Sequence, residues 1–193
     1  MTSCRRRLFA ISLGAALTAC AQLKPGSPGA SPPAVLARED LSPGFIGFIG
    51  PKAQHAPPFL GTPGTNFYCL RSFLDRRTGE ATHQLYVSDS YFGAERGWNA
   101  ARDSTGAQLP FVPVSRDEIA CEDRCSYVEE FAATLSDSKM RASRDGLAVT
   151  FVSGAGNEKT IIVTGDRIAA QFAAVDARRN PAQPRAAFGM TPP

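Results

Sequence analysis

The 193-residue sequence has only two histidines, and this scarcity limits the chemistry it can carry. Histidine is a common general base and metal ligand near neutral pH, so two of them leave little room for a catalytic pair or a zinc site. His55 lies among prolines, and His83 lies in an alternating segment where a solvated or half-buried position is the default. We therefore predict no catalytic residue, no metal and no cofactor, with a hydrolase using His83 as a less favoured alternative.

A long apolar run is also missing. Residues 8–19 are almost free of polar side chains, but a helix needs roughly 20 apolar residues to cross a bilayer. The run follows three consecutive arginines at positions 5–7, and a charged segment before a short apolar one is typical of a secretory signal peptide. The sequence thus predicts a removable signal over residues 1–19 and no permanent transmembrane helix.

Residues 17–20, Leu-Thr-Ala-Cys, resemble the lipobox of bacterial lipoprotein precursors. The resemblance implies cleavage before Cys20 and acylation of its thiol and new amine. Two or three acyl chains anchor a protein stably, whereas one chain binds reversibly. The residue after Cys20, Ala21, is not acidic. In this the chain resembles lipoproteins that are sorted to the outer membrane with their domain in the periplasm. An ordinary signal peptide that ends near a cysteine is the alternative.

Excess charge of one sign is absent from the expected mature chain. The precursor carries 21 basic and 18 acidic residues, and cleavage removes three arginines, which leaves 18 of each sign. Nucleic-acid binding domains usually present a basic surface. We therefore predict no nucleic-acid partner. The expected partners are the membrane, through the lipid, and another envelope protein.

Cysteines are few, and their positions differ in meaning. Cys4 would leave with the signal peptide, and Cys20 would carry the lipid, which leaves Cys69, Cys121 and Cys125. Cys121 and Cys125 are separated by three residues, a length suited to a hairpin turn in which cross-strand neighbours reach disulfide distance. We predict a Cys121–Cys125 disulfide and a buried free thiol at Cys69. A redox pair is a weaker alternative, because the spacing is not C-x-x-C. A zinc site is another, because it would need His55 or His83 to join cysteines that can instead form a disulfide.

Residues 20–64 are rich in proline, glycine, alanine and serine, a composition typical of a flexible tether. Within them residues 45–50, Phe-Ile-Gly-Phe-Ile-Gly, form a short apolar patch. Three interpretations stay open for this patch: an edge strand docked on the domain, a loosely ordered segment, or a recognition peptide for another envelope protein.

Residues 65–178 show short segments of alternating polarity separated by turn residues, which favours antiparallel sheet. We predict a mainly β (α+β) domain, a sheet or sandwich of about six to eight strands with a C-terminal helix over residues 166–177. Residues 128–135 fit helix as well as strand. Residues 179–193 contain several prolines and are expected to form a loose tail.

The strand with residues 85–89, Leu-Tyr-Val-Ser-Asp, and the hairpin with residues 121–129, Cys-x-x-x-Cys-Ser-Tyr-Val-Glu, resemble uncharacterised small bacterial lipoproteins. This resemblance supports the architecture and implies no activity. The preferred hypothesis is a non-enzymatic, lipid-anchored envelope protein that binds a protein or supports envelope assembly. The alternative is a small-ligand or glycan groove near Tyr86, Tyr91 and Trp98, since aromatic side chains often line such grooves.

Overall fold

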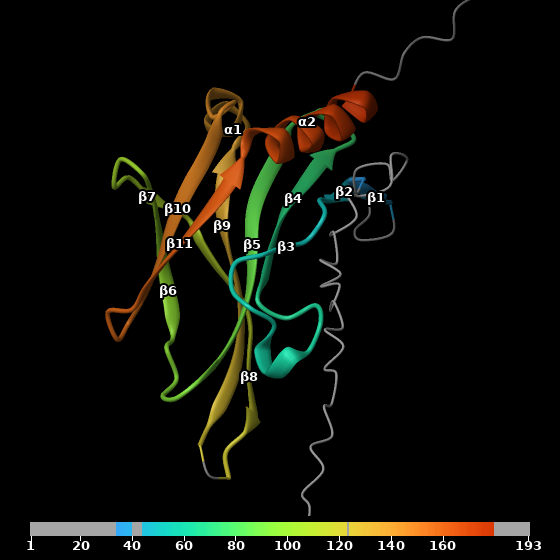
Figure 1. Cartoon of the computed structure of the whole chain (residues 1–193). Coiled ribbons are helices and arrows are strands. Elements are labelled where there is room, and N and C mark those ends of the chain that lie inside the picture. Colours follow the sequence, from blue (N-terminus) through green and yellow to red (C-terminus); the bar gives the residue numbers. More distant parts are fainter. Residues whose placement is uncertain (1–33, 40–43, 123, 180–193) are drawn as a thin grey trace, which may run out of the picture. The chain divides into compact units, whose positions relative to one another are not determined.

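The computed structural model describes residues 34–39, 44–122 and 124–179, and they form two antiparallel sheets and two α-helices (Figure 1). The predicted mainly β sandwich with a C-terminal helix is confirmed. Eleven strands occur in these residues, and eight of them have five or more residues. The predicted signal peptide, the lipidation residue Cys20 and residues 180–193 of the predicted tail lie outside the described residues.

The larger sheet contains seven strands and the smaller sheet four. The larger sheet has the order β1 (Leu36–Arg38), β2 (Phe45–Ile49), β4 (Phe67–Asp75), β5 (Ala81–Phe92), β9 (Ser126–Ser136) and β8 (Phe111–Ala120), with β3 (Ala53–Gln54) also paired to β4. The smaller sheet has the order β11 (Glu158–Thr164), β10 (Gly146–Ser153), β6 (Trp98–Asp103) and β7 (Gln108–Leu109). A short 3-10 helix, η1, covers Phe59–Gly61 between β3 and β4.

The alternation of buried and less buried residues along the strands forms the core between the two sheets. In β10 every second residue is buried, so Leu147, Val149 and Phe151 point inward while their neighbours face outward. Because successive strand residues point to opposite faces, one apolar set per strand suffices to form the interior. The main core contains aliphatic and aromatic residues from both sheets and from both helices, including Leu85, Val87, Phe131, Leu135, Phe151, Ile161, Met140 and Ile168.

Strand β9 settles the ambiguity over residues 128–135. The whole stretch is strand, and β9 pairs with β5 on one side and with β8 on the other. The helix formers in this segment are overridden because backbone groups on both sides of the strand are paired and its inward residues fill the core. The helical alternative is therefore wrong.

The segment predicted as a tether is folded from β1 and β2 onward. Strand β2 pairs with β4, and its side chains Ile46 and Phe48 are buried against Leu74 and Val175. The domain boundary predicted at residue 65 is therefore too late. The proline and glycine content of this segment led to the prediction of a tether. The short apolar strand within it gives little local signal, because it is stabilised by adding to an existing sheet. Of the three interpretations of residues 45–50, docking as a strand is confirmed, but β2 is not the edge strand, because β1 pairs with its outer side.

Two helices lie at one end of the sandwich (Figure 1). Helix α2 (Gly165–Arg179) agrees with the prediction, and it buries Ile168, Gln171 and Val175. Helix α1 (Asp137–Ala142) was not predicted; the side chain of Ser136 caps it by accepting a hydrogen bond from the Lys139 backbone N–H at 3.1 Å. Neither helix has both the length and the apolar composition that a bilayer crossing requires.

Candidate functional site

Two buried carboxylates face each other at the end of the sandwich opposite the helices. Asp89 on β5 and Glu129 on β9 are direct cross-strand partners, and they are 2% and 3% exposed. Like charges at such positions repel, and a buried carboxylate is costly unless cations or N–H groups surround it. The side chains around this pair therefore decide whether it is stable.

Asp89 is held by donors from the loop after β5 and from the smaller sheet. Its Oδ2 accepts hydrogen bonds from Arg96 Nη1 at 2.8 Å and from Trp98 Nε1 at 3.2 Å. Its Oδ1 lies 2.8 Å from Lys159 Nζ, which comes from β11. Both carboxylate oxygens are thus paired, and the contacts join β5 to β6 and β11.

Glu129 holds the backbone where the chain crosses from one sheet to the other. Its Oε1 accepts a hydrogen bond from the Gly97 N–H at 3.0 Å, and its Oε2 accepts one from the Trp98 N–H at 3.1 Å. Oε1 also accepts from the hydroxyl of Tyr91, and Oε2 lies 3.5 Å from Arg116 Nε on β8. We call Asp89 and Glu129, together with the residues that bind their carboxylates, the Asp89–Glu129 clamp.

Tyr91 completes the clamp as a neutral donor. Burial, and then its hydrogen bond to Glu129, raises the pKa of Tyr91 above its ordinary value, so the phenol keeps its proton. The same oxygen accepts a hydrogen bond from the Arg96 N–H at 2.9 Å. Because every carboxylate oxygen already has partners, the clamp is suited to holding the chain rather than to proton transfer.

The aromatic residues predicted to line one groove do not share a face. Tyr91 and Trp98 both contact the Asp89–Glu129 clamp. Tyr86 points to the opposite face of the larger sheet, where it packs with Phe67 and Cys69. Trp98 does line a cavity of about 190 Å³ that borders β8 and β9. The structure therefore brings two of the three residues together and places the third elsewhere.

Asp89 and Glu129 were missed as site residues by sequence reasoning, although they end two of the segments quoted for the resemblance. A signal was present in the alternation. Leu85, Val87 and Asp89 occupy the same face of β5, so a carboxylate continues a row of inward apolar residues. An acidic residue in such a row indicates a buried, partnered carboxylate.

Ser72, His83 and Asp137 form a hydrogen-bonded chain of the residue types used by serine hydrolases. Ser72 Oγ lies 2.7 Å from His83 Nδ1, and His83 Nε2 lies 3.2 Å from Asp137 Oδ1. Ser72 and His83 are both 0% exposed, and Ser72 Oγ also accepts a hydrogen bond from Gln171 Nε2 at 2.8 Å. In this conformation the Ser72 oxygen is closed to a substrate, so the chain acts as an internal link between β4, β5, α1 and α2.

The shifted pKa values in this link favour a neutral His83 imidazole beside a charged Asp137 carboxylate. Burial lowers the pKa of His83 below its ordinary 6.5, although Asp137 opposes the shift. Burial by itself would raise the pKa of Asp137, but hydrogen bonds from Arg141, His83 and Arg179 outweigh it and lower that pKa to about 2. A neutral His83 accepts from Ser72 at Nδ1 and donates from Nε2.

We expect the unfolding free energy to fall as pH drops below about 6.5. Burial also lowers the pKa of His55, so both histidines take up protons in the unfolded chain before they do so in the folded protein. The loss is at most about 1.4 kcal/mol per pH unit for each histidine. A second loss begins as pH falls below about 3.8 and continues toward about 2, where Asp137 is protonated.

Urea unfolding between pH 5 and 8 measures the first of these losses. His83→Gln is expected to reduce the slope of unfolding free energy against pH, and His55→Gln to reduce it independently. Equal slopes in His83→Gln and the unaltered protein would contradict the assignment of a neutral buried His83.

The turn between β8 and β9 is closed by the predicted Cys121–Cys125 disulfide, and Cys69 is a buried free cysteine, as predicted. Burial raises the pKa of the Cys69 thiol, which makes it a poor nucleophile. Glu118 lies beside the disulfide with ligand atoms within 4.8 Å, but bonded sulfurs offer no thiolate to a metal.

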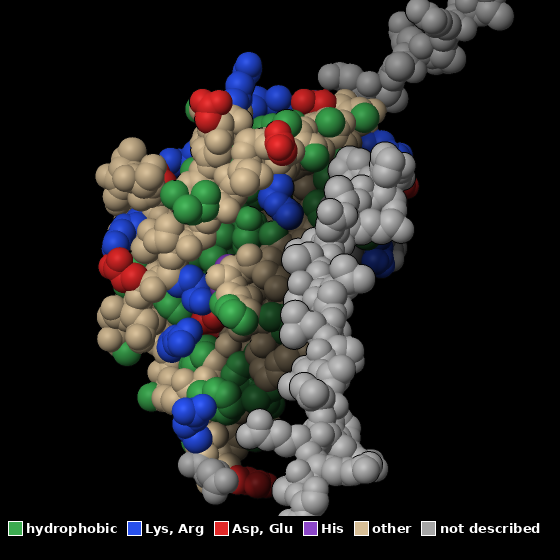
Figure 2. All heavy atoms as spheres, in the orientation of Figure 1, with side chains coloured by type: hydrophobic (Ala, Val, Ile, Leu, Met, Phe, Trp, Pro, Cys, Tyr) green, Lys and Arg blue, Asp and Glu red, His purple; other side chains and the backbone are tan. Residues whose placement is uncertain are grey.

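Strand β8 is exposed along most of its length. Its residues 113–120 are all exposed, and β8 forms an open edge of the larger sheet. Val114 and Ile119 are 48% and 50% exposed. Figure 1 shows the β8–β9 hairpin extending past the neighbouring strands, and Figure 2 shows apolar side chains on the surface of the same lower region.

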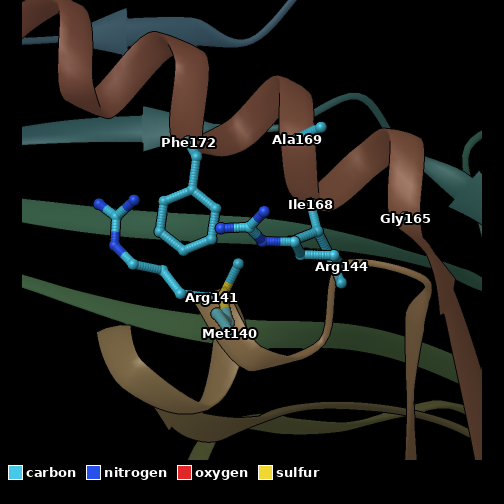
Figure 3. Close-up of a pocket in the computed structure, with 7 residues that line it drawn as sticks. All are labelled: Met140, Arg141, Arg144, Gly165, Ile168, Ala169 and Phe172. Carbon is cyan, nitrogen blue, oxygen red and sulfur yellow. The ribbon is translucent and has the colours of Figure 1, made fainter.

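A cavity of about 290 Å³ lies at the other end of the domain, between the two helices (Figure 3). It is lined by Met140, Arg141, Arg144, Gly165, Ile168, Ala169 and Phe172. Arg144 passes so close to α2 that a Cβ on Gly165 would lie 2.2 Å from the Arg144 carbonyl oxygen. Glycine is therefore required where this turn meets the helix.

Comparison of the chain with protein-family models, with curated proteins and with solved structures finds no match. The resemblance to small bacterial lipoproteins therefore stays a prediction.

Proposed function

We propose that this chain is a lipid-anchored lipoprotein of the bacterial envelope that binds another envelope protein through the β8–β9 hairpin. The anchor is Cys20, on the evidence of the signal sequence and lipobox, and the outer membrane facing the periplasm is the proposed location. The observation that carries the binding proposal is the exposure of residues 113–120 along an open sheet edge.

The exposed edge favours an extended segment of a partner protein. An edge strand offers unpaired N–H and C=O groups, and a segment that adds to it gains main-chain hydrogen bonds and side-chain contacts. Val114 and Ile119 supply exposed apolar contacts on β8. Phe92, also exposed, lies near the hairpin turn with Arg124 over its ring at 4.0 Å. The partner segment should therefore be extended and partly apolar.

Features of β8 limit how much chain can add to it. Register shifts interrupt its pairing with β9 between Pro113 and Ser115 and between Glu118 and Ala120. Unlimited strand addition leads to aggregation, and proline, bulges and charged residues on an edge strand reduce it. The regular part between the two shifts is short, so it favours a short specific segment over self-assembly.

The hairpin is held at both ends before a partner arrives. The disulfide closes its turn, and Arg116 ties its base to Glu129 of the clamp and to Glu95 of the adjacent loop. A preorganised surface loses less conformational freedom on binding than a flexible one. The clamp therefore supports the proposed interface without touching the partner.

A photoreactive residue placed at position 119 in the full-length, exported protein tests the proposal. We expect a discrete cross-linked protein in living cells. The same probe at position 162 is the matched control, because Ile162 is 68% exposed on β11, the edge strand of the other sheet. Recovery of the same pattern from both positions, or of no protein from position 119, would contradict binding through the hairpin.

A further inference from the structure

We propose that the cavity between α1 and α2 binds a small amphipathic carboxylate. The apolar chain would lie against Phe172 and Ala169, above the buried Met140 and Ile168, and the carboxylate would bind Arg144. This site lies at the opposite end of the domain from the hairpin, so the inference goes beyond the proposed function and does not depend on it.

The floor of the cavity is apolar and built by both helices. Met140 from α1 and Ile168 from α2 are buried, and Phe172 lies one turn further along α2. Figure 3 shows Arg141 and Arg144 extending beside the Phe172 ring. Met140 and Ile168 support the lining from beneath, and Phe172 and Ala169 provide its accessible apolar surface.

The charges around the cavity distinguish its two arginines. Arg141 is already neutralised, with its Nε 2.6 Å from Asp137 Oδ2 and its Nη2 2.9 Å from Asp176 Oδ1. Its guanidinium also lies over the Phe172 ring, 4.2 Å from the centroid. Arg141 is therefore part of the wall and has little free charge to offer a ligand.

Arg144 is exposed and makes no ion pair or hydrogen bond through its side chain with any residue in the described ranges. Asp145 and Asp166 line an adjacent hollow that Arg144 shares, and neither forms an ion pair with it there. A guanidinium at the mouth of an apolar cavity is complementary to a carboxylate, which it can bind through two parallel hydrogen bonds. The pairing of an apolar floor with this free cation selects an amphipathic anion.

The volume limits the size of the ligand. A cavity of about 290 Å³ is near the lower end of ligand pockets. At roughly 30 Å³ for each water-sized group, about ten non-hydrogen atoms fit. Octanoate has this size and carries one carboxylate, so it is a suitable probe.

Titration of the full chain with sodium octanoate, followed by calorimetry and by backbone NMR shifts at Ala169 and Phe172, tests the proposal. We expect saturable binding with shifts confined to α1, α2 and the turn that carries Arg144. Octanamide, which keeps the chain and lacks the charge, should bind the protein at least about tenfold more weakly than octanoate does. Octanoate should lose affinity for Arg144→Gln by a similar factor.

Two alanines of α2 provide matched variants. Ala169→Leu fills the cavity and should weaken octanoate binding by roughly tenfold or more, whereas Ala173→Leu, on an exposed position outside the lining, should leave it unchanged. Both variants keep a good helix former, so both should fold. The proposal is overturned by absent saturation at millimolar octanoate, by unchanged affinity in Arg144→Gln, or by equal effects of the two leucine variants.

Discussion

Glu129→Ala is expected to lower the free energy of unfolding by about 3 to 5 kcal/mol. The carboxylate is 3% exposed and accepts from the Gly97 and Trp98 N–H groups and from the Tyr91 hydroxyl. Its removal leaves these donors without a protein acceptor, and Arg116 loses its buried partner. Removing one member of a buried charged network costs more than the network contributes as a whole, because the remaining groups stay buried.

Denaturant unfolding of Glu129→Ala beside Glu158→Ala measures this effect. Glu158 is also a glutamate in an ion pair, 2.8 Å from Arg102, but its side chain is 52% exposed. Exposed ion pairs contribute about 0 to 1 kcal/mol, so Glu158→Ala should change stability little. Similar losses in the two variants would mean that the Asp89–Glu129 clamp does not hold the two sheets together.

His83→Ala is expected to lower the free energy of unfolding by about 3 to 5 kcal/mol as well. The imidazole is 0% exposed, so its loss leaves a cavity against Phe172, whose ring centroid lies 5.2 Å away. Ser72 loses the acceptor for its hydroxyl proton, and Asp137 loses one of its donors. The cost therefore combines lost packing with unsatisfied buried polar groups.

A matched control for His83 is His55→Ala. His55 is only partly buried in the loop that follows β3, and its Nε2 lies 2.9 Å from the carbonyl oxygen of Ser88 on β5. Calorimetric melting of both variants should show a large decrease in Tm for His83→Ala and a small one for His55→Ala. A folded His83→Ala protein with unchanged Tm would remove the structural role of the Ser72–His83–Asp137 link and reopen a chemical one.

The elements that were predictable are those in which local pattern and tertiary environment agree. Helix α2 was visible from the spacing of Ile168 and Val175 and from an acidic residue at its start, and both apolar residues are buried. The disulfide was visible because Cys121 and Cys125 flank a turn-length segment between two strands. In each case a few adjacent residues carried the whole signal.

The N-terminal strands were not predictable in the same way. Phe48 is buried because β4 and α2 supply its surroundings, and those elements are distant in sequence. A five-residue strand among glycines and prolines has little intrinsic preference for its conformation. Its stability depends on an existing sheet edge, which a local pattern cannot reveal.

The candidate site was hidden for a related reason. Asp89 and Glu129 are 40 residues apart, and they become neighbours only through the register of β5 with β9. A shift of one residue in that register would turn one of the two side chains to the other face. The sequence could therefore indicate an inward carboxylate on each strand, but the pairing of the two needed the three-dimensional structure.

We propose that the lipid-anchored protein contacts an envelope partner through the β8–β9 hairpin. The most direct measurement is in-cell cross-linking from position 119, with position 162 as control, in cells fed a labelled fatty acid that reports on acylation at Cys20. We expect the labelled protein to form one discrete adduct from position 119, and we expect Cys20→Ser to abolish the label. An unlabelled exported protein would contradict the anchor, and absence of the adduct from position 119 would contradict the interface.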